Sequence, residues 1–129
     1  MSKRNYSMSI SPNFEEAHHF CWKCKHEVLE DRQYDIVKCP ICNNNISVCT
    51  TYNDWNYYLQ KKYVDEIEVG DLVLLRSDMK YHEVLEVEEI EDDLYKVALK
   101  GYRVVKLKSD DFVECANGTW NENDKPWER

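Results

Sequence analysis

Two pairs of cysteines carry the strongest chemical signal in the sequence. Cys21 and Cys24 form one Cys-X-X-Cys pair, Cys39 and Cys42 form a second, and fourteen residues separate the pairs. Each pair can bind one side of a tetrahedral Zn²⁺ ion, and the intervening stretch is long enough for a hairpin that returns the second pair to the metal. We therefore expect these four thiolates to bind one Zn²⁺. Four protein ligands leave no position for water or substrate, so this zinc is expected to stabilise a fold and not to catalyse a reaction.

Other interpretations of these residues stay open at the level of sequence. Six cysteines in a short chain also suit a disulfide framework, but the N-terminus lacks the apolar run of a secretory signal. That favours a reducing compartment in which thiols bind metal, and we expect a cytoplasmic protein. Redox catalysis by one pair is less favoured, because no βαβ pattern surrounds either pair. His18, His19 or His26 could replace a thiolate, although four cysteines complete a site without them. Cys49 and Cys115 are expected to be buried as small apolar residues.

The segments around the two pairs predict short strands. Residues 27–38 place apolar dipeptides on either side of a polar turn, and residues 46–49 read as a third strand after three asparagines. Two Cys-X-X-Cys turns on hairpins, followed by a strand, make the segment of about residues 18–50 resemble the zinc-ribbon family. Members often have glycine just after each pair, where this chain has Lys25 and Asn43. Asparagine tolerates the left-handed backbone region, whereas lysine does not favour it.

Residues 51–64 have the most unusual local composition, with five aromatic side chains in fourteen positions. We expect them to form an aromatic linker. If the segment is helical, Trp55 and Tyr58 share a face beside Lys61 and Lys62, where they could stack on bases or bind a partner protein. Trp55 and Tyr58 are therefore candidate partner-binding residues. The alternative, favoured by the small size of both cores, is that the aromatic side chains pack the ribbon onto a second domain.

From Asp65 onward the sequence predicts five short strands separated by turn signals, at intervals of about eight to fourteen residues. The pattern, with Val69-Gly70-Asp71 before the first strand, is similar to that of SH3-like or Tudor-like barrels. In the second of these elements, Tyr81–Ile90, the spacing of the apolar residues also fits a helical stripe, so a helix there is the alternative.

The expected fold class is mainly β, with an N-terminal zinc ribbon and a C-terminal small SH3-like β-barrel. The expected boundaries are an N-terminal arm over residues 1–17, the zinc ribbon over 18–50, the aromatic linker over 51–64, the acidic β-barrel over 65–116 and a C-terminal tail over 117–129. No segment approaches the roughly 18 apolar residues of a membrane span, so no membrane partner is expected.

The charge distribution bears on the choice of partner. The formal net charge is -8, and nearly all of the excess acid lies after residue 64. Lys and Arg supply most of the affinity of proteins for nucleic acid, so we expect direct binding to free nucleic acid to be weak, with a Kd no better than about 10⁻⁵ M at physiological salt.

An acidic turn is the candidate partner-binding feature of the second half. Carboxylates are concentrated within the eleven residues 83–93, and they include Glu83, Glu86, Glu88, Glu91, Asp92 and Asp93. We select Glu91, Asp92 and Asp93 as partner-binding candidates, because concentrated charge steers a protein toward a basic surface. The alternative is a solvated edge that blocks aggregation between strands.

The sequence contains no nucleophile elbow, phosphate-binding glycine loop or other catalytic constellation, so we assign no catalytic residue and expect no enzyme. The leading hypothesis is a zinc-binding adaptor or inhibitor that binds a larger protein or nucleoprotein complex of transcription, translation or nuclease machinery. A compact, highly charged chain of this kind is typical of virus-encoded regulatory proteins. The alternative is a direct nucleic-acid-binding protein that uses the zinc ribbon and the aromatic linker, and a small metalloenzyme is the third hypothesis.

Overall fold

The computed structural model describes residues 17–28 and 36–128, and most of the regular structure in them is β-strand. The expected mainly β fold is confirmed. The helices among these residues are two short 3-10 helices, η1 (Val64–Glu66) and η2 (Pro126–Glu128). In the described ranges no helix has the length and hydropathy needed to cross a membrane. The expected N-terminal arm lies outside the described residues except for Ala17, which begins a strand.

The described residues form two compact units. The first unit contains residues 17–61 and 117–128, and the second contains residues 62–116. This division differs from the boundaries expected from the sequence, which made residues 51–64 a linker and residues 117–129 a tail. Both segments instead contribute strands and packed side chains.

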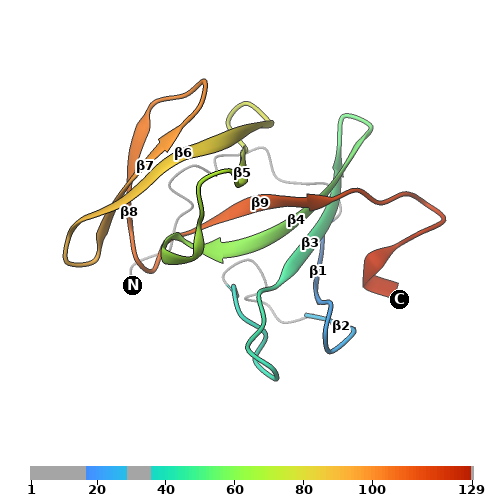
Figure 1. The fold of residues 1–129 in the computed structure, drawn as a ribbon. Helices are drawn as coiled ribbons and strands as arrows, with labels where there is room; N and C mark the ends of the chain where they lie inside the picture. The colour runs from blue at the N-terminus through green and yellow to red at the C-terminus, as the bar shows by residue number, and fades with distance from the viewer. Residues whose placement is uncertain (1–16, 29–35, 129) are drawn as a thin grey trace. The chain divides into compact units, whose positions relative to one another are not determined.

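An antiparallel sheet with the strand order β2-β1-β3-β4 forms the first unit. Its strands are β1 (Ala17–Cys21), β2 (His26–Glu27), β3 (Ser47–Tyr52) and β4 (Trp55–Tyr63). The last two residues of β4 belong to the second unit. Strand β3 lies between β1 and β4 (Figure 1). Phe20 and Gln60 both lie opposite Ser47, and Tyr58 lies opposite Cys49. Because directly paired residues share a face and residues two apart in a strand do too, Phe20, Tyr58 and Gln60 lie on one face of the sheet.

A two-residue turn joins β3 to β4. Asn53 and Asp54 have φ angles of 52° and 64°, which is the left-handed conformation that a type I′ hairpin turn requires and that Asn and Asp tolerate. Residues 51–64 are thus mostly strand. Trp55 and Tyr58, three residues apart in β4, lie on opposite faces, so the helical interpretation in which they share a face is wrong.

Residues 117–128 return to the first unit. Gly118 has a φ of 128°, and a Cβ atom at this position would lie 3.6 Å from the Tyr58 ring, so the chain passes close to that ring. Trp120 then donates its indole N–H to the carbonyl oxygen of Tyr57 at 3.0 Å, and Asn56 donates its amide to the carbonyl oxygen of Trp120 at 3.1 Å. These bonds fix the segment to β4.

Two tryptophans of this segment cover the sheet. Trp127 stacks on His18 of β1, with ring centroids 4.0 Å apart and ring planes 7° apart. Trp120 packs edge-on against Trp127 and is buried in a cluster with Phe20 and Cys49. Residues 117–128 therefore contribute to the core of the first unit.

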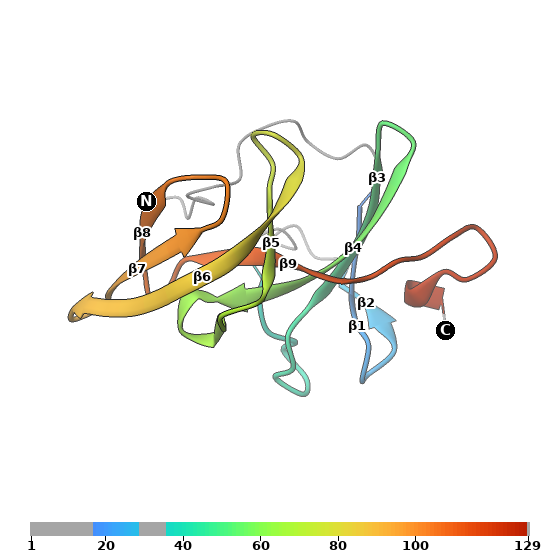
Figure 2. The same ribbon diagram turned by 45° about the horizontal axis from the view of Figure 1, so that its top comes forward.

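The second unit contains five antiparallel strands, as expected. They are β5 (Leu72–Leu75), β6 (Lys80–Glu91), β7 (Leu94–Leu99), β8 (Val104–Lys108) and β9 (Phe112–Gly118), in the order β9-β5-β6-β7-β8. Figure 2 shows the long β6 strand beside β7. Strand β5 lies between β9 and β6, and the last three residues of its apolar sequence are buried.

Strand β6 settles the ambiguity over residues 81–90. The whole segment is strand, so the helical alternative is wrong. Its register with β7 shifts between Val84 and Glu86 and again between Glu89 and Glu91. A β-bulge inserts one extra residue, so Val84 and Val87 both pack against the core although they are three positions apart. The bulge thus produces a spacing that resembles a helical stripe.

A buried ion pair links the end of β5 to β9. The guanidinium of Arg76 donates two hydrogen bonds, at 2.8 and 2.6 Å, to the carboxylate of Glu114. Arg76 is 5% exposed and Glu114 is 1% exposed. The bidentate geometry satisfies both charges, and loss of one partner would leave the other charge buried.

We expect Glu114→Gln to lower the free energy of unfolding by about 3–5 kcal/mol, because it leaves the Arg76 charge buried without its partner. Urea unfolding followed by circular dichroism measures this loss. The double variant Arg76→Met/Glu114→Leu removes both charges and should recover most of it. Glu88→Gln, which breaks an exposed pair with Lys96, is the control and should change little. Equal losses in Glu114→Gln and Glu88→Gln would contradict this account.

Candidate metal centre

Four cysteine sulfur atoms gather in the first unit. The Sγ atoms of Cys21, Cys24, Cys39 and Cys42 all lie within 4.8 Å of one another. Those of Cys21 and Cys42 are 3.4 Å apart, and those of Cys24 and Cys39 are 3.9 Å apart. A tetrahedral ion with Zn–S bonds of about 2.3 Å places its sulfur ligands about 3.8 Å apart. The cluster therefore has the size of a four-thiolate metal site, and the expected grouping of these residues is confirmed.

Both Cys-X-X-Cys turns have the same backbone geometry. The N–H of Lys25 donates to the carbonyl oxygen of Cys21 at 2.8 Å, and the N–H of Asn43 donates to that of Cys39 at 2.8 Å. Lys25 has a φ of 59° and Asn43 a φ of 66°. Glycine often occupies this position of the tight turn, but the first turn has lysine there. A residue with a side chain adopts the left-handed conformation at a cost of about 1–2 kcal/mol.

Hydrogen-bond donors surround the sulfur atoms. The N–H of Cys24 lies 3.3 Å from the Sγ of Cys21, and the N–H of Ile41 lies 3.4 Å from the Sγ of Cys39. The side-chain amide of Asn44 donates to the Sγ of Cys42 at 3.2 Å. These donors orient the thiolates and offset part of their negative charge.

The two pairs differ in acidity. Burial raises the pKa of Cys21, and the hydrogen bond with Cys42 raises the pKa of Cys24 to about 12. Burial also acts to raise the pKa of Cys39, but backbone N–H groups outweigh it and lower the pKa to about 6. The backbone of Asn44 lowers the pKa of Cys42. All four sulfur atoms must be thiolates to bind a metal, so metal binding would release the protons that the cluster holds.

The histidines near the first pair have other partners. The Nδ1 atom of His18 lies 2.8 Å from the carboxylate of Glu27, and His26 lies 3.1 Å from the Glu27 carbonyl oxygen and 3.9 Å from the Sγ of Cys39. Within the described ranges, the group of side chains that can hold a metal consists of the four cysteines. Histidine ligation is therefore not supported.

The remaining cysteines lie elsewhere. Cys49 is buried beside Phe20 and Trp120, and Cys115 is buried in the core of the second unit, where burial raises its pKa to about 12. All six cysteines are free thiols, and the separations in the cluster far exceed a disulfide bond of about 2.05 Å. The structure favours the metal interpretation over the disulfide framework.

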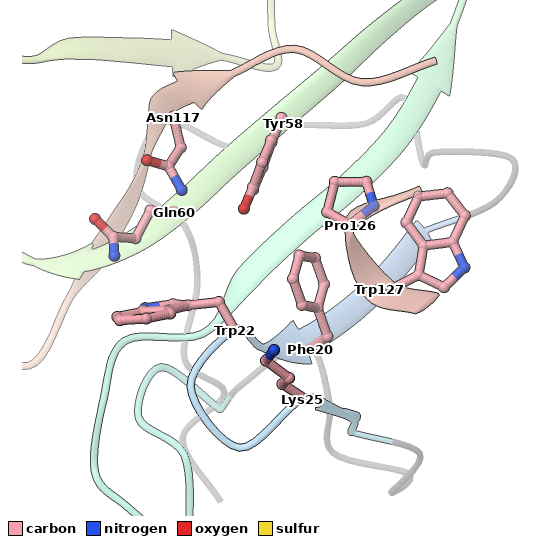
Figure 3. A pocket seen from close by; sticks show the side chains of 8 residues that line it. All are labelled: Phe20, Trp22, Lys25, Tyr58, Gln60, Asn117, Pro126 and Trp127. Atoms are coloured by element: carbon pink, nitrogen blue, oxygen red, sulfur yellow. The ribbon is translucent and has the colours of Figure 1, made fainter. Parts of the chain in front are cut away.

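A groove of about 590 Å³ adjoins the first Cys-X-X-Cys turn in the same unit. We call it the Trp22 groove. Its lining residues come from β1, from the turn after β1, from β4 and from residues 117–127. The lining residues are Phe20, Trp22, Lys25, Tyr58, Gln60, Asn117, Pro126 and Trp127 (Figure 3). Among them, sequence reasoning named Tyr58 as a partner-binding candidate and Lys25 as a possible contact to nucleic acid. Two further residues had a signal in the sequence: Trp22 lies between two of the clustered cysteines, where the turn does not require it, and Trp127 is a large aromatic residue in the expected tail.

The other partner-binding candidates are not among the lining residues of this groove. Trp55 is 63% exposed at the start of β4 and does not line the groove, so the structure does not bring Trp55 and Tyr58 together. Glu91, Asp92 and Asp93 are exposed at the turn between β6 and β7 in the second unit. Asp93 has a φ of 70° and its carboxylate accepts a hydrogen bond from the hydroxyl of Ser109, so this residue shapes the turn.

Comparisons of the chain with protein-family models, with curated proteins and with solved structures found no match.

We expect the purified protein to contain about one zinc ion per chain and Cys39→Ser to lose it, because binding energy and folding energy are the same quantity in small metal modules. Native mass spectrometry measures the metal content, and circular dichroism measures folding of the first unit. Cys49→Ala, which changes a buried cysteine outside the cluster, is the control and should retain the ion. A purified wild-type protein without metal, or with a disulfide between these cysteines, would contradict the site.

The positive φ of Lys25 generates a second prediction. We expect Lys25→Gly to raise the free energy of unfolding of the metal-loaded protein by up to about 1 kcal/mol, because glycine adopts the left-handed region without a steric penalty. Lys25→Val should lower it by at least about 1 kcal/mol, since a β-branched residue is a strong outlier there. Lys23→Gly in the same turn is the control and should not stabilise. Chemical unfolding gives all three values, and stabilisation by Lys25→Val would contradict the backbone assignment.

Proposed function

We propose that this chain is a zinc-binding, non-catalytic adaptor or inhibitor that binds a larger protein or nucleoprotein complex. The observation that carries the proposal is the closed set of four sulfur atoms. Four thiolates around one ion leave no open coordination position, so the metal's contribution is to hold a small fold together and present its surface.

The chemistry of the donor set supports zinc as the ion. Four thiolates in a tetrahedral arrangement suit Zn²⁺ or iron, whereas calcium and magnesium prefer oxygen ligands. The turns around both pairs and the strand β3 that follows them support a zinc ribbon over about residues 18–50. The five antiparallel strands of the second unit support a small SH3-like barrel. Free thiols in this number are compatible with a reducing, cytoplasmic compartment, and we keep a virus-encoded regulator as part of the proposal.

The surface charge of the second unit supports a basic partner. Residues 62–116 contain fifteen Asp and Glu residues and eight Lys and Arg residues. Glu86 and Glu88 pair with Lys96 at 3.6 and 3.3 Å, whereas Glu91 and Asp92 at the end of β6 are exposed. An exposed acidic turn on an acidic unit would accelerate encounter with a basic protein surface.

An affinity pull-down from native extract, with and without nuclease treatment, tests the proposal. Recovery of a protein complex that survives nuclease supports an adaptor or inhibitor. Recovery that depends on nucleic acid would instead favour the alternative, a direct nucleic-acid-binding protein.

We expect the variant Glu91→Ser/Asp92→Ser to associate with the recovered partner about twofold to tenfold more slowly at low salt, and the difference should shrink at high salt because salt screens steering. Asp93 stays unchanged because it shapes the turn. Asp65→Ser/Glu68→Ser removes the same number of exposed charges from the same unit and serves as the control. Surface plasmon resonance measures both rates, and an unchanged rate with unchanged salt dependence would show that the acidic turn is only solvated surface.

A further inference from the structure

The Trp22 groove combines flat aromatic surface with hydrogen-bonding side chains. Trp22 is 53% exposed, so one of the largest aromatic rings in the chain borders solvent at the groove. Tyr58 lies on the same face of the sheet as Phe20, with ring centroids 6.0 Å apart. An exposed indole next to further rings is a surface on which another planar group can stack.

Two primary amides lie at one end of the groove. Gln60 lies on the Tyr58 face of β4, and Asn117 lies near it on β9 (Figure 3). Figure 3 also shows the Tyr58 hydroxyl directed into the space between these amides and the Trp22 ring. Each amide presents one acceptor and two donors, which is the combination that reads the edge of an unpaired base. A purely apolar ligand would offer no hydrogen bonds to the amides of Gln60 and Asn117.

The charge of the groove differs from that of the chain. The sequence has 25 Asp and Glu residues, yet none of the eight lining residues is acidic, and Lys25 is the charged residue among them. A lysine ammonium in an acid-free groove suits an anionic group such as phosphate.

From these observations we propose that the Trp22 groove binds an unpaired nucleobase together with its phosphate. The base stacks on Trp22, Gln60 and Asn117 hydrogen-bond its edge, and Lys25 contacts the phosphate. The ligand is either a free nucleoside monophosphate or one nucleotide of a single strand, because a base paired in a duplex cannot enter such a groove. This site does not depend on the protein partner proposed above, since the acidic turn belongs to the other unit. Failure of either test therefore leaves the other intact.

The tryptophan indole N–H signals in a ¹H–¹⁵N NMR spectrum test the site, because the chain has four tryptophans and each reports its own surroundings. The probes are AMP, CMP, GMP and UMP, single-stranded hexanucleotides, and a duplex of the same sequence. We expect the Trp22 signal to shift and saturate with at least one mononucleotide or single strand, and the Trp55 signal to stay in place. Saturation by a mononucleotide identifies a free nucleotide site, and saturation by hexanucleotides alone identifies a single-strand site.

Variants provide the second part of the test. Trp22→Ala should weaken binding about tenfold or more, as loss of a stacking partner does. Trp55→Ala changes the other highly exposed tryptophan of the unit and should leave affinity unchanged. Lys25→Asn keeps a residue that tolerates the left-handed turn but removes the charge, so it should weaken binding and reduce its salt dependence. Metal content and circular dichroism verify that each variant is folded.

Three outcomes would overturn the proposal. The first is a Trp22 signal that does not shift with any nucleotide probe at about millimolar concentration. The second is an equal loss of affinity in Trp22→Ala and Trp55→Ala, and the third is a duplex that binds as tightly as the single strand. A proline-rich peptide serves as a further probe, because aromatic grooves also bind such segments. If the peptide shifts the Trp22 signal and no nucleotide does, the groove is a peptide site and the nucleobase proposal is wrong.

Discussion

The convergence of four sulfur atoms is the constraint on which the first unit depends. The small core around them consists of Cys21, Cys39, Val28 and Ile46, with Cys24, Ile36 and Cys42 packed against it, so cysteines make up much of the available core. Thiols alone bury little apolar surface, and four thiolates in contact repel one another. A doubly charged cation at their centre would offset this repulsion and join the four side chains. The same cluster includes the end of β1 and flanks the turn that carries Trp22 and Lys25, so the wall of the groove is built beside the candidate metal ligands.

Sequence reasoning succeeded where local patterns decide structure. The spacing of the cysteines predicted their grouping, and apolar runs bounded by turn residues predicted the five strands of the second unit. It failed where distant contacts decide. A bulge in β6 gave Val84 and Val87 a helix-like spacing, and the aromatic segment formed a hairpin because Asn53 and Asp54 adopt a type I′ turn. The groove draws on residues as far apart in the sequence as Phe20 and Trp127, and no local pattern contains that information.

The two units reach stability by different routes. The second unit has a core of valine, leucine and isoleucine side chains from β5 to β9, together with the Arg76–Glu114 pair that closes one end of β5. Burial of apolar surface is sufficient for such a fold. The first unit has a smaller apolar core and adds the four-cysteine cluster, stacked rings and hydrogen bonds to the carbonyl oxygens of Tyr57 and Trp120. Chelation and acid should therefore act on the first unit, because protons and chelators compete for the same thiolates.

The first unit is interrupted in the sequence by the whole of the second. Residues 62–116 separate β4 from the segment that carries Trp120 and Trp127. During translation, the face of β1 that bears His18 and Phe20 is complete long before the tryptophans that cover it have been synthesised. The described residues of the second unit, 62–116, are continuous in sequence. The first must hold its partial sheet until residues 117–128 arrive, and each contact they make spans a large loop whose closure slows folding. The groove consequently cannot be complete before residues 117–127 have been synthesised, and an incomplete chain exposes the kind of apolar surface that chaperones recognise.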